Sequence, residues 1–305
     1  AGDMPDGGLR AGLRDYLAWA RQEGCRVIGV ISNGRRRSCG GVARRLGEAG
    51  ANRLTVAVHG HTARLHDSQT RTPGSFEQSV EGLRRAVALR RAHRLEVHTS
   101  TVVSRRTLEH VPAIHQFLSR LNPDLMVFNV MMPVGRGARR LATWMPAYAE
   151  VAEIFARLAT DLGEQQLRQL RLVDLPLCVG RDLPFPLWGE PERFQQYERA
   201  GSSGLDGVEE NRAGRARPAT HGHAPQLEAD GSYHLTGRDE KDHTLRIKPE
   251  PCEACAAALA CPGVYRSYVE AMGHDELRPL AAADMASLDR GHGKKRRRKI
   301  RIIPG

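Results

Sequence analysis

The stretch Leu95-Glu96-Val97-His98-Thr99-Ser100-Thr101-Val102-Val103 decides the fold that we expect for this chain. β-Branched residues dominate it, and such a run is typical of a strand. Apolar residues then recur at helical spacing over residues 107–121, namely Leu108, Val111, Ile114, His115 and Leu118. That spacing predicts a helix directly after the strand. A strand followed at once by a helix is half of a βαβ unit, so the stretch predicts parallel strand pairing.

The same unit recurs on both sides of this stretch. Further strands are expected at residues 25–31, 54–58 and 125–131, and further helices at 9–23, 42–49, 75–93 and 146–162, with a polar loop at 59–74. Strands that alternate with helices predict an α/β fold with right-handed crossovers, for which a (β/α) barrel or partial barrel is the natural solution. A doubly wound open sheet fits the alternation nearly as well, although no G-x-G-x-x-G fingerprint follows the first strand.

The working face of such a sheet is the edge where the parallel strands end. The residues expected on that edge are Ser32-Asn33, His59, Thr101 and Met132-Pro133. Cys25, at the start of the first expected strand, is expected in the core. His66-Asp67 could serve as an acid/base pair, with a loop salt link as the alternative.

Charge and composition limit the possible functions. The net charge of the 305 residues is +11, and eight of the basic residues lie at or beyond Arg290. We expect this tail to be disordered, as a solvated terminus or as a contact for an acidic partner. A nucleic-acid partner is not expected, because aromatic residues make up only 5% of the chain and none interleaves with the basic run. The sequence shows no bilayer-spanning apolar run and no signal peptide, so we expect a cytoplasmic protein without a membrane partner.

Three of the six cysteines lie close together near the C-terminus, in Cys252-Glu253-Ala254-Cys255 and Cys261-Pro262-Gly263. The C-x-x-C turn is typical of a metal site or a redox pair. The third thiol favours a metal site, because a dithiol redox site does not need it. Cys178 is the upstream candidate for a fourth ligand. Iron and zinc share thiolate ligands, so the spacing leaves open an iron–sulfur cluster or a structural zinc ion.

This cysteine stretch resembles the C-terminal cluster-binding extension of radical SAM proteins, the SPASM or twitch type. The resemblance rests on the C-x-x-C-x5-C spacing, on Gly263-Val264-Tyr265, on Tyr268 and on the segment at 273–279. It implies that Cys178, Cys252, Cys255 and Cys261 hold an auxiliary four-iron four-sulfur cluster. It also implies three regions, which are a partial radical SAM-like barrel at 1–175, the extension at 176–285 with a long polar loop at about 190–248, and the basic tail at 286–305.

The upstream region resembles the same superfamily, whose fold is a partial (β/α)6 barrel. Ile31-Ser32-Asn33-Gly34 is similar to its T-N-G segment, and Val58-His59-Gly60, with the downstream 66–76 stretch, is similar to its S-x-h-G…D…G-s-F stretch. Pro133-Val134-Gly135-Arg136-Gly137 is similar to its P-x-G-R segment. The resemblance implies S-adenosylmethionine as cofactor. By matching position, the residues on the S-adenosylmethionine side are Asp3, Ser32, Asn33, His59 and Thr101.

One departure from the superfamily affects the expected function. The C-x3-C-x2-C signature of the catalytic cluster is absent from this sequence. We therefore expect an incomplete barrel. Three explanations are open: the protein is truncated, it is half of a split enzyme whose partner polypeptide supplies that loop, or it is a degenerate member of the superfamily. The resemblance implies an electron donor and a peptide or small-molecule substrate, and it assigns no catalytic residue. The alternative function is a non-catalytic zinc-binding module with a basic tail for an acidic or nucleic-acid partner.

Overall fold

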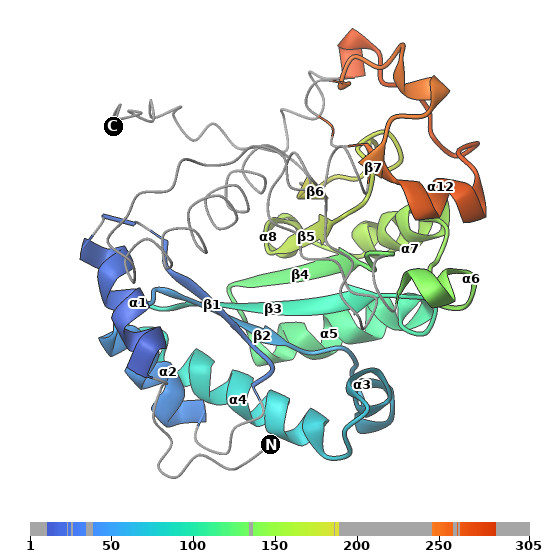
Figure 1. Ribbon diagram of the computed structural model, residues 1–305. Coiled ribbons are helices and arrows are strands. Elements are labelled where there is room, and N and C mark those ends of the chain that lie inside the picture. Colours follow the sequence, from blue (N-terminus) through green and yellow to red (C-terminus); the bar gives the residue numbers. More distant parts are fainter. Residues whose placement is uncertain are drawn as a thin grey trace.

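The computed structural model describes residues 11–22, 24–25, 27–34, 39–133, 137–185, 187–188, 246–258, 261 and 263–284. Its centre is a six-stranded sheet, with a smaller two-stranded sheet beyond its last strands (Figure 1). The strands of the large sheet are β1 (Gly29–Ser32), β2 (Arg53–Ala57), β3 (Glu96–Val103), β4 (Leu125–Val130), β5 (Leu170–Val173) and β6 (Leu187–Trp188).

All neighbouring strands in this sheet are parallel, and their order is β1-β2-β3-β4-β5-β6. A doubly wound sheet needs a point where the strand order reverses, and this order has none. The doubly wound alternative is therefore wrong for these strands, and the order is compatible with a partial α/β barrel. Because every strand runs the same way, the carboxyl ends of all six meet at one edge of the sheet.

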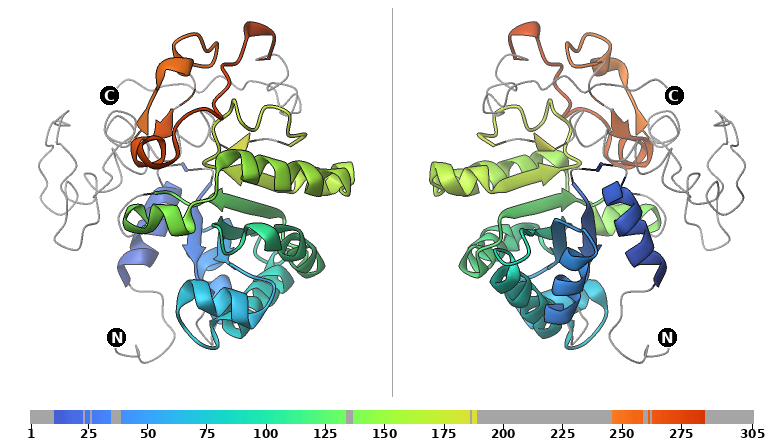
Figure 2. Two further views of the ribbon diagram at one scale, coloured as in Figure 1. Left: turned by 90° about the vertical axis from the view of Figure 1, so that its right-hand side faces the viewer. Right: turned by 90° about the vertical axis from the view of Figure 1, so that its left-hand side faces the viewer.

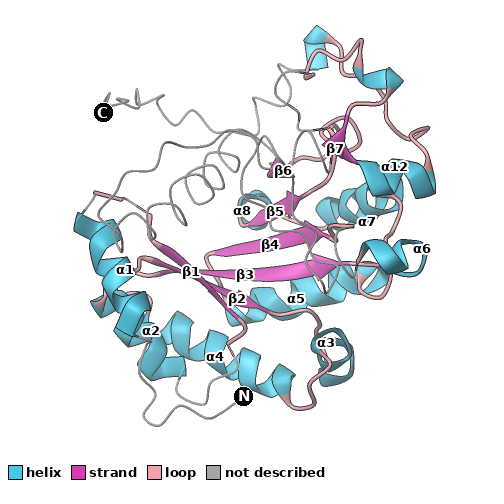
Figure 3. Ribbon diagram, viewed as in Figure 1, coloured by secondary structure: helices cyan, strands magenta, loops and turns pink. Residues whose placement is uncertain are grey.

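Helices alternate with the strands, as Figure 3 shows. They are α1 (Ala11–Gln22), α2 (Cys39–Glu48), α3 (Ala63–Thr70), α4 (Ser75–Leu89), α5 (Val111–Leu121), α6 (Leu141–Trp144), α7 (Tyr148–Thr160), α8 (Glu164–Arg168) and α12 (Arg266–Met272), with short 3₁₀ turns η1 (Leu108–His110), η2 (Ala138–Arg140) and η4 (Glu250–Cys252). Helices α4, α5 and α7 pack side by side against the sheet (Figure 2). Among the described residues, no helix combines the length and apolar character that a membrane crossing requires.

The main core lies between the central strands and these helices. Phe128 of β4 and Phe155 of α7 are fully buried, and their rings meet edge to face with centroids 5.3 Å apart. The helical face expected from the sequence is buried as well: Val111, Ile114, His115 and Leu118 of α5 all point inward. The hydrophobic periodicity of the sequence therefore places the core correctly.

The described residues of 11–160 confirm the expected strands and helices in type, and they contain two helices that the sequence does not predict, α3 and α6. The predicted polar loop at 59–74 contains α3, whose N-cap Thr62 accepts a hydrogen bond from the backbone N–H of Leu65 at 3.4 Å. The sequence does not predict this helix because its residues are mostly polar and lack a clear apolar stripe. The last two strands of the large sheet, β5 and β6, are also absent from the prediction. Their apolar runs are short, and each depends on pairing with a neighbour that sequence periodicity does not show.

The C-terminal extension docks on the start of α7. Strands β7 (Arg246–Ile247) and β8 (Val264–Tyr265) pair antiparallel and lead into α12. The ring of Tyr268 stacks on that of Tyr148, with centroids 4.0 Å apart, and its hydroxyl accepts a hydrogen bond from the Tyr148 N–H at 3.0 Å. The same hydroxyl donates to Glu276, whose carboxylate also accepts from the Ala149 N–H at 2.7 Å. Two of the N–H groups that a helix start leaves unpaired are thus satisfied by the extension.

The substitution Tyr268→Phe tests this docking. It removes the hydroxyl and leaves the buried Tyr148 N–H without its acceptor, so we expect the free energy of unfolding to fall by about 1–3 kcal/mol. Chemical denaturation of the wild-type and variant chains measures the change. The matched control is Tyr16→Phe, because Tyr16 lies on α1 with 41% of its surface exposed. Equal stability of Tyr268→Phe and wild type would show that the hydroxyl does not hold the extension on α7.

Candidate functional site

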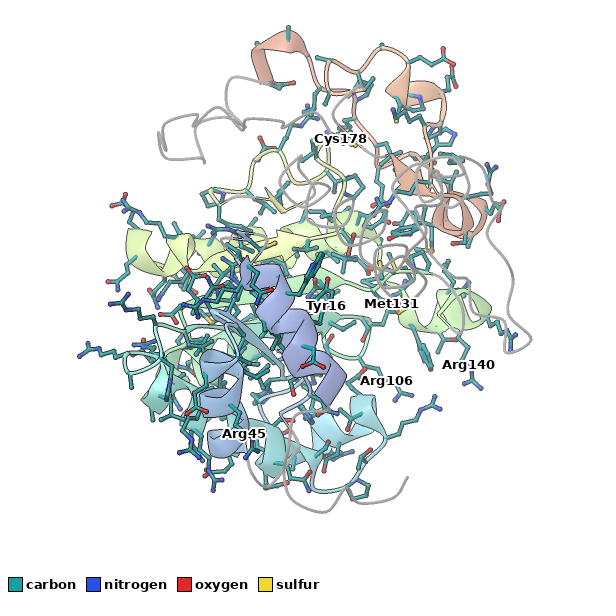
Figure 4. All side chains as sticks on the ribbon, turned by 60° about the vertical axis from the view of Figure 1, so that its left-hand side comes forward. Tyr16, Arg45, Arg106, Met131, Arg140 and Cys178 are labelled. Carbon is teal, nitrogen blue, oxygen red and sulfur yellow. The ribbon has the colours of Figure 1, made fainter. Side chains whose placement is uncertain are left out.

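Four cysteines from two distant parts of the chain line one cavity. They are Cys178, Cys252, Cys255 and Cys261, and all four line the same small cavity. The other lining residues are mostly apolar, among them Leu177, Ala257 and Leu280, and Lys248 is the one charged side chain among the described residues that line it. Figure 4 shows Cys178 at the junction between the sheet and the extension. The cavity therefore offers thiols in a largely apolar pocket.

Local turns position these cysteines. Cys178 lies in the turn that follows β5, where the N–H groups of Val179 and Gly180 both donate to the Pro176 carbonyl. Cys252 ends η4, and the Cys255 N–H donates back to the Cys252 carbonyl at 3.2 Å, which closes the C-x-x-C turn. After Cys261, Gly263 has a φ of 84°, and a Cβ there would lie 2.4 Å from the Ile247 carbonyl oxygen. Only glycine allows the chain to pass β7 so closely.

The electrostatics of the cavity favour neutral thiols when nothing is bound. Burial is the largest cause that raises the pKa of Cys178, to about 11, and the Cys261, Cys252 and Cys255 thiols add to it. Burial likewise raises the pKa values of Cys252 and Cys261, with neighbouring thiols contributing. The Leu280 N–H points at the Cys255 sulfur, 3.4 Å away. Because metals bind thiolates, loading a metal centre here would release protons.

A buried ion pair joins the two segments that carry these cysteines. Arg246 of β7 donates to Asp174 at 3.0 Å, and the side chains of the pair are only 11% and 5% exposed. Asp174 directly follows β5 and so leads to Cys178, whereas Arg246 leads to Cys252. The guanidinium also donates to the carbonyl of Gly263 and to the hydroxyl of Tyr265, each at 3.1 Å. One side chain thus holds three backbone segments around the cavity.

The ionisation of this pair follows from its surroundings. Burial lowers the pKa of Arg246, but the neighbouring Tyr265 and Asp174 outweigh burial and hold the pKa above its ordinary value. The guanidinium also lies over the Tyr265 ring, 4.1 Å from its centroid, which adds a cation–π contact. Arg246 is therefore charged at neutral pH.

The spacing of the thiols bears on the kind of metal centre. Within the part of the chain that the structure describes, no three Cys, His, Asp or Glu side chains stand close enough together to hold a single metal ion. All four cysteines belong to that part and line the same cavity. The four thiols therefore share one cavity without forming a single-ion site among the described residues.

The expected S-adenosylmethionine side begins at the end of β1. The Ser32 hydroxyl oxygen accepts a hydrogen bond from the Gly34 N–H at 3.1 Å, and the Asn33 carbonyl accepts from the Ser79 hydroxyl at 2.6 Å. These bonds fix the turn against α4. Asp3 lies outside the described residues, so the assignment of Asp3, Ser32 and Asn33 to a cofactor stays a prediction.

His59 lies just after β2, and Thr101 lies on the neighbouring strand β3, near the same edge. The Thr101 side chain is fully buried, and its hydroxyl donates to the Val58 carbonyl at 2.6 Å. The His59 Nδ1 accepts from the Val102 N–H at 3.2 Å. Burial and the nearby His66 lower the pKa of His59 to about 4, so the imidazole is neutral at pH 7. Both side chains bond within the sheet edge, and their cofactor role also stays a prediction.

The His66-Asp67 pair acts structurally in this chain. The Asp67 carboxylate accepts hydrogen bonds from the Gly74 N–H at 2.7 Å and from the Phe76 N–H and the Ser75 hydroxyl at 2.8 Å each. It thus caps the start of α4. Burial raises the pKa of Asp67, but these bonds outweigh it and lower the pKa below its ordinary value. The His66 Nδ1 accepts from the His59 N–H at 3.0 Å. Neither side chain is placed as an acid/base pair with the other.

Cys25 corrects one expectation. The thiol is exposed rather than in the core, because β1 begins only at Gly29 and Cys25 lies in the turn after α1. The basic tail from Arg290 and most of the 190–248 loop lie outside the described residues. Strand β7, at the end of that predicted loop, is described and paired.

The sequence did not predict the Asp174–Arg246 pair. A charged residue directly after a buried strand was the available signal at Asp174. Nothing near Arg246 indicated its partner, because the two residues are 72 positions apart. The pair became visible only when the fold brought β5 and β7 together.

The chain is similar to proteins that use S-adenosylmethionine. It is 30% identical over 149 residues to a protein named AdoMet-dependent heme synthase from Oleidesulfovibrio alaskensis, a match that covers 48% of this chain and 37% of that protein. A protein of the same name from Methanosarcina barkeri is 30% identical over 96 residues, covering 32% and 26%. One from Nitratidesulfovibrio vulgaris is 26% identical over 130 residues, covering 43% and 34%.

These matches show similarity to part of each relative. All three relatives carry a name that states dependence on AdoMet, which is S-adenosylmethionine. The chain matches about a third of the length of the curated relatives. No family model matches it.

The substitution Asp174→Asn tests the buried ion pair. It leaves the Arg246 charge buried without its partner, so we expect the free energy of unfolding to fall by about 3–5 kcal/mol. Replacing both residues, as Asp174→Asn with Arg246→Met, removes the uncompensated charge and should recover part of that loss. Chemical denaturation of the single and double variants measures both effects.

The control for this experiment is an exposed ion pair. Glu81 and Arg85 lie 2.6 Å apart on α4 with side chains 49% and 45% exposed, so Glu81→Gln should cost at most about 1 kcal/mol. A loss no larger for Asp174→Asn than for Glu81→Gln would show that the buried pair does not hold the two segments together.

Proposed function

We propose that this chain carries the sheet and the auxiliary-cluster region of a radical SAM-type enzyme, with a four-iron four-sulfur cluster bound by Cys178, Cys252, Cys255 and Cys261. The observation that carries the proposal is the convergence of these four thiols on one cavity. The similarity to AdoMet-dependent proteins supports the same class of chemistry. We further propose that the sheet is part of a (β/α)6 partial barrel.

The similarity to AdoMet-dependent proteins favours a cluster over a zinc ion. A structural zinc site draws four ligands to about 2.3 Å from one ion, so its sulfurs stand close together. A four-iron cluster takes the same four thiolates, but its own irons and sulfides fill the space between them. The same four thiols could serve either centre, and we favour the cluster because the proteins similar to this chain depend on S-adenosylmethionine.

The residues around the cavity would serve the cluster in distinct ways. Bound there, an iron–sulfur cluster supplies one-electron redox chemistry. Leu177, Ala257 and Leu280 keep water from the thiolates, and the Leu280 N–H would stabilise the charge on the Cys255 sulfur. Arg246 orients the cysteine-bearing segments and places a fixed positive charge near them.

The S-adenosylmethionine side of the proposed enzyme is the carboxyl edge of the sheet. Ser32, Asn33 and His59 lie there, at the ends of β1 and β2. In a parallel α/β sheet this edge is where ligands bind. The cysteine loop that binds the catalytic cluster in the superfamily is not in this sequence, so we propose that it comes from polypeptide outside the 305 residues.

For the substrate we propose a tetrapyrrole. The relatives are named for heme synthesis, and heme is a flat macrocycle with carboxylate side chains. The match covers about a third of each relative, and the proposed substrate rests on that shared name. A peptide substrate was equally open from the sequence, and the similarity favours the tetrapyrrole.

Metal analysis tests the proposed cluster. Anaerobically purified and reconstituted wild-type chain should hold about four irons and about four sulfides and show the brown colour of a four-iron cluster. Cys178→Ser should lose most of this iron, because it removes the ligand that lies outside the 252–261 segment. Cys25→Ser is the matched control and should keep the wild-type content, since Cys25 is exposed and does not line the cavity.

Two outcomes would contradict the proposal. About one zinc per chain with no iron would identify a structural zinc site instead. Equal iron loss in Cys178→Ser and Cys25→Ser would mean that the four thiols do not act as one ligand set. Circular dichroism of each variant separates loss of metal from loss of fold.

A further inference from the structure

Two arginines flank one tryptophan beside the carboxyl edge of the sheet. The guanidinium of Arg140 lies 5.7 Å from the centroid of the Trp144 ring, and that of Arg71 lies 6.0 Å from it. Both arginines are exposed, and the ring is half-buried. The face of an indole attracts a guanidinium and helps to hold it in place. The ring therefore gathers two positive charges from segments about seventy residues apart.

A third arginine joins this group through the backbone. The Arg105 N–H donates to the Trp144 carbonyl at 2.8 Å, which ties the loop after β3 to the end of α6. Arg106 follows in the same loop, and Figure 4 shows Arg106 and Arg140 both projecting outward on the same side of the molecule. The arginines come from the end of α3, the loop after β3 and the segment after β4, three places that parallel strands bring to one edge.

Few carboxylates offset these charges. Glu150 lies 3.8 Å from Arg105, and Asp67 is engaged at the start of α4. Glu109 is exposed on η1 and forms no ion pair with another described residue. In addition, the Trp144 Nε1–H is buried and has no hydrogen-bond acceptor in the part of the chain that the structure describes. Buried donors normally have a hydrogen-bond acceptor. This buried N–H, which lies beside several guanidinium groups, therefore indicates that an acceptor from a ligand is missing.

The geometry points to a binding site for a carboxylate-bearing flat ligand, formed by Trp144, Arg71, Arg140 and Arg105. This inference rests on the proposed function, because the ligand it names is the tetrapyrrole substrate proposed there. The Arg71 and Arg140 guanidinium groups bind its carboxylates with paired N–H donors, and Arg105 holds the Trp144 backbone in place. The Trp144 Nε1–H donates to a carboxylate oxygen, and the exposed planes of the guanidinium groups contact the macrocycle. We name these four residues the Trp144 site.

The position of the site relative to the extension supports this role. Helix α12 packs against α6, and the Ser267 hydroxyl donates to the Pro133 carbonyl at 2.8 Å. The segment that carries Trp144 is thus held between the sheet edge and the extension that carries three of the cysteines. A substrate bound at the Trp144 site would lie at the same edge as the proposed S-adenosylmethionine side.

Titration with hemin tests the inference on the full chain, without cluster reconstitution. We expect saturable binding, followed by the change in hemin absorbance, and a weaker affinity at higher salt. Hemin dimethyl ester, whose carboxylates are blocked, should bind about tenfold or more weakly, because a charge-assisted hydrogen bond stabilises a complex by roughly that factor. Arg140→Gln and Arg71→Gln should each weaken hemin binding by about tenfold and leave ester binding unchanged.

The matched control is Arg120→Gln. Arg120 is exposed in the last turn of α5, which lies at the opposite edge of the sheet, so its loss should leave hemin binding at the wild-type level. Each variant exchanges an exposed side chain, and circular dichroism checks that it folds.

The outcomes separate this inference from the proposed function. Hemin and its ester binding equally, or Arg140→Gln and Arg120→Gln behaving alike, would overturn the Trp144 site and leave the cluster and the tetrapyrrole substrate untouched. No binding of hemin by the wild-type chain would overturn the site together with the tetrapyrrole substrate. Loss of the cluster in the metal analysis would overturn the enzyme class and would not change the binding result.

Discussion

The ion pair of Asp174 and Arg246 is the contact on which the functional region depends. Its two charged side chains are nearly excluded from water. Replacing only one of them leaves the other charge buried without a partner, which lowers the stability of the fold. The pair fixes the end of β5 to the start of β7, and the cysteines follow each of these strands within a few residues. A cavity with thiols from both segments exists because this contact sets the distance between them.

The parallel sheet supplies the second constraint. Sequential parallel strands bring every strand end to one edge, so loops that are distant in sequence become neighbours. The S-adenosylmethionine side, the Trp144 site and the turn that carries Cys178 all follow carboxyl ends of strands. The extension then covers part of the same edge by capping α7 with Tyr268 and Glu276. We thus propose that the iron–sulfur cluster, S-adenosylmethionine and the substrate all bind on one face of the fold.

Much of this fold could be predicted from the sequence because its signals are local. The strand pattern followed by a helix pattern over residues 95–121 indicates parallel strand pairing. The buried faces of β3 and α5 follow from hydrophobic periodicity. Helix α3 could not be predicted in this way because its cap and its tertiary contacts, rather than an apolar stripe, define it. The choice between a barrel-like and a doubly wound sheet required strand order, which no local pattern contains.

The candidate site could be predicted only in part from the sequence. Thiol chemistry alone grouped Cys178 with the three later cysteines, and the structure lines one cavity with all four. The residues that organise that cavity were not predictable, since Asp174 and Arg246 pair across 72 positions and no pattern links them. The arginines around Trp144 were hidden for the same reason, because their proximity comes from the sheet and not from their spacing in the sequence.

Cross-linking of the metal-free chain tests most directly whether the buried ion pair brings the two cysteine segments together. A short reagent that bridges two thiols, followed by peptide mass spectrometry, should join Cys178 to a peptide from the 252–261 segment within one chain. Cys25 should carry only single-ended reagent, since it is exposed and away from the cavity. Single-ended labelling of Cys178, with links only among Cys252, Cys255 and Cys261, would show that the two segments do not meet and would contradict the account.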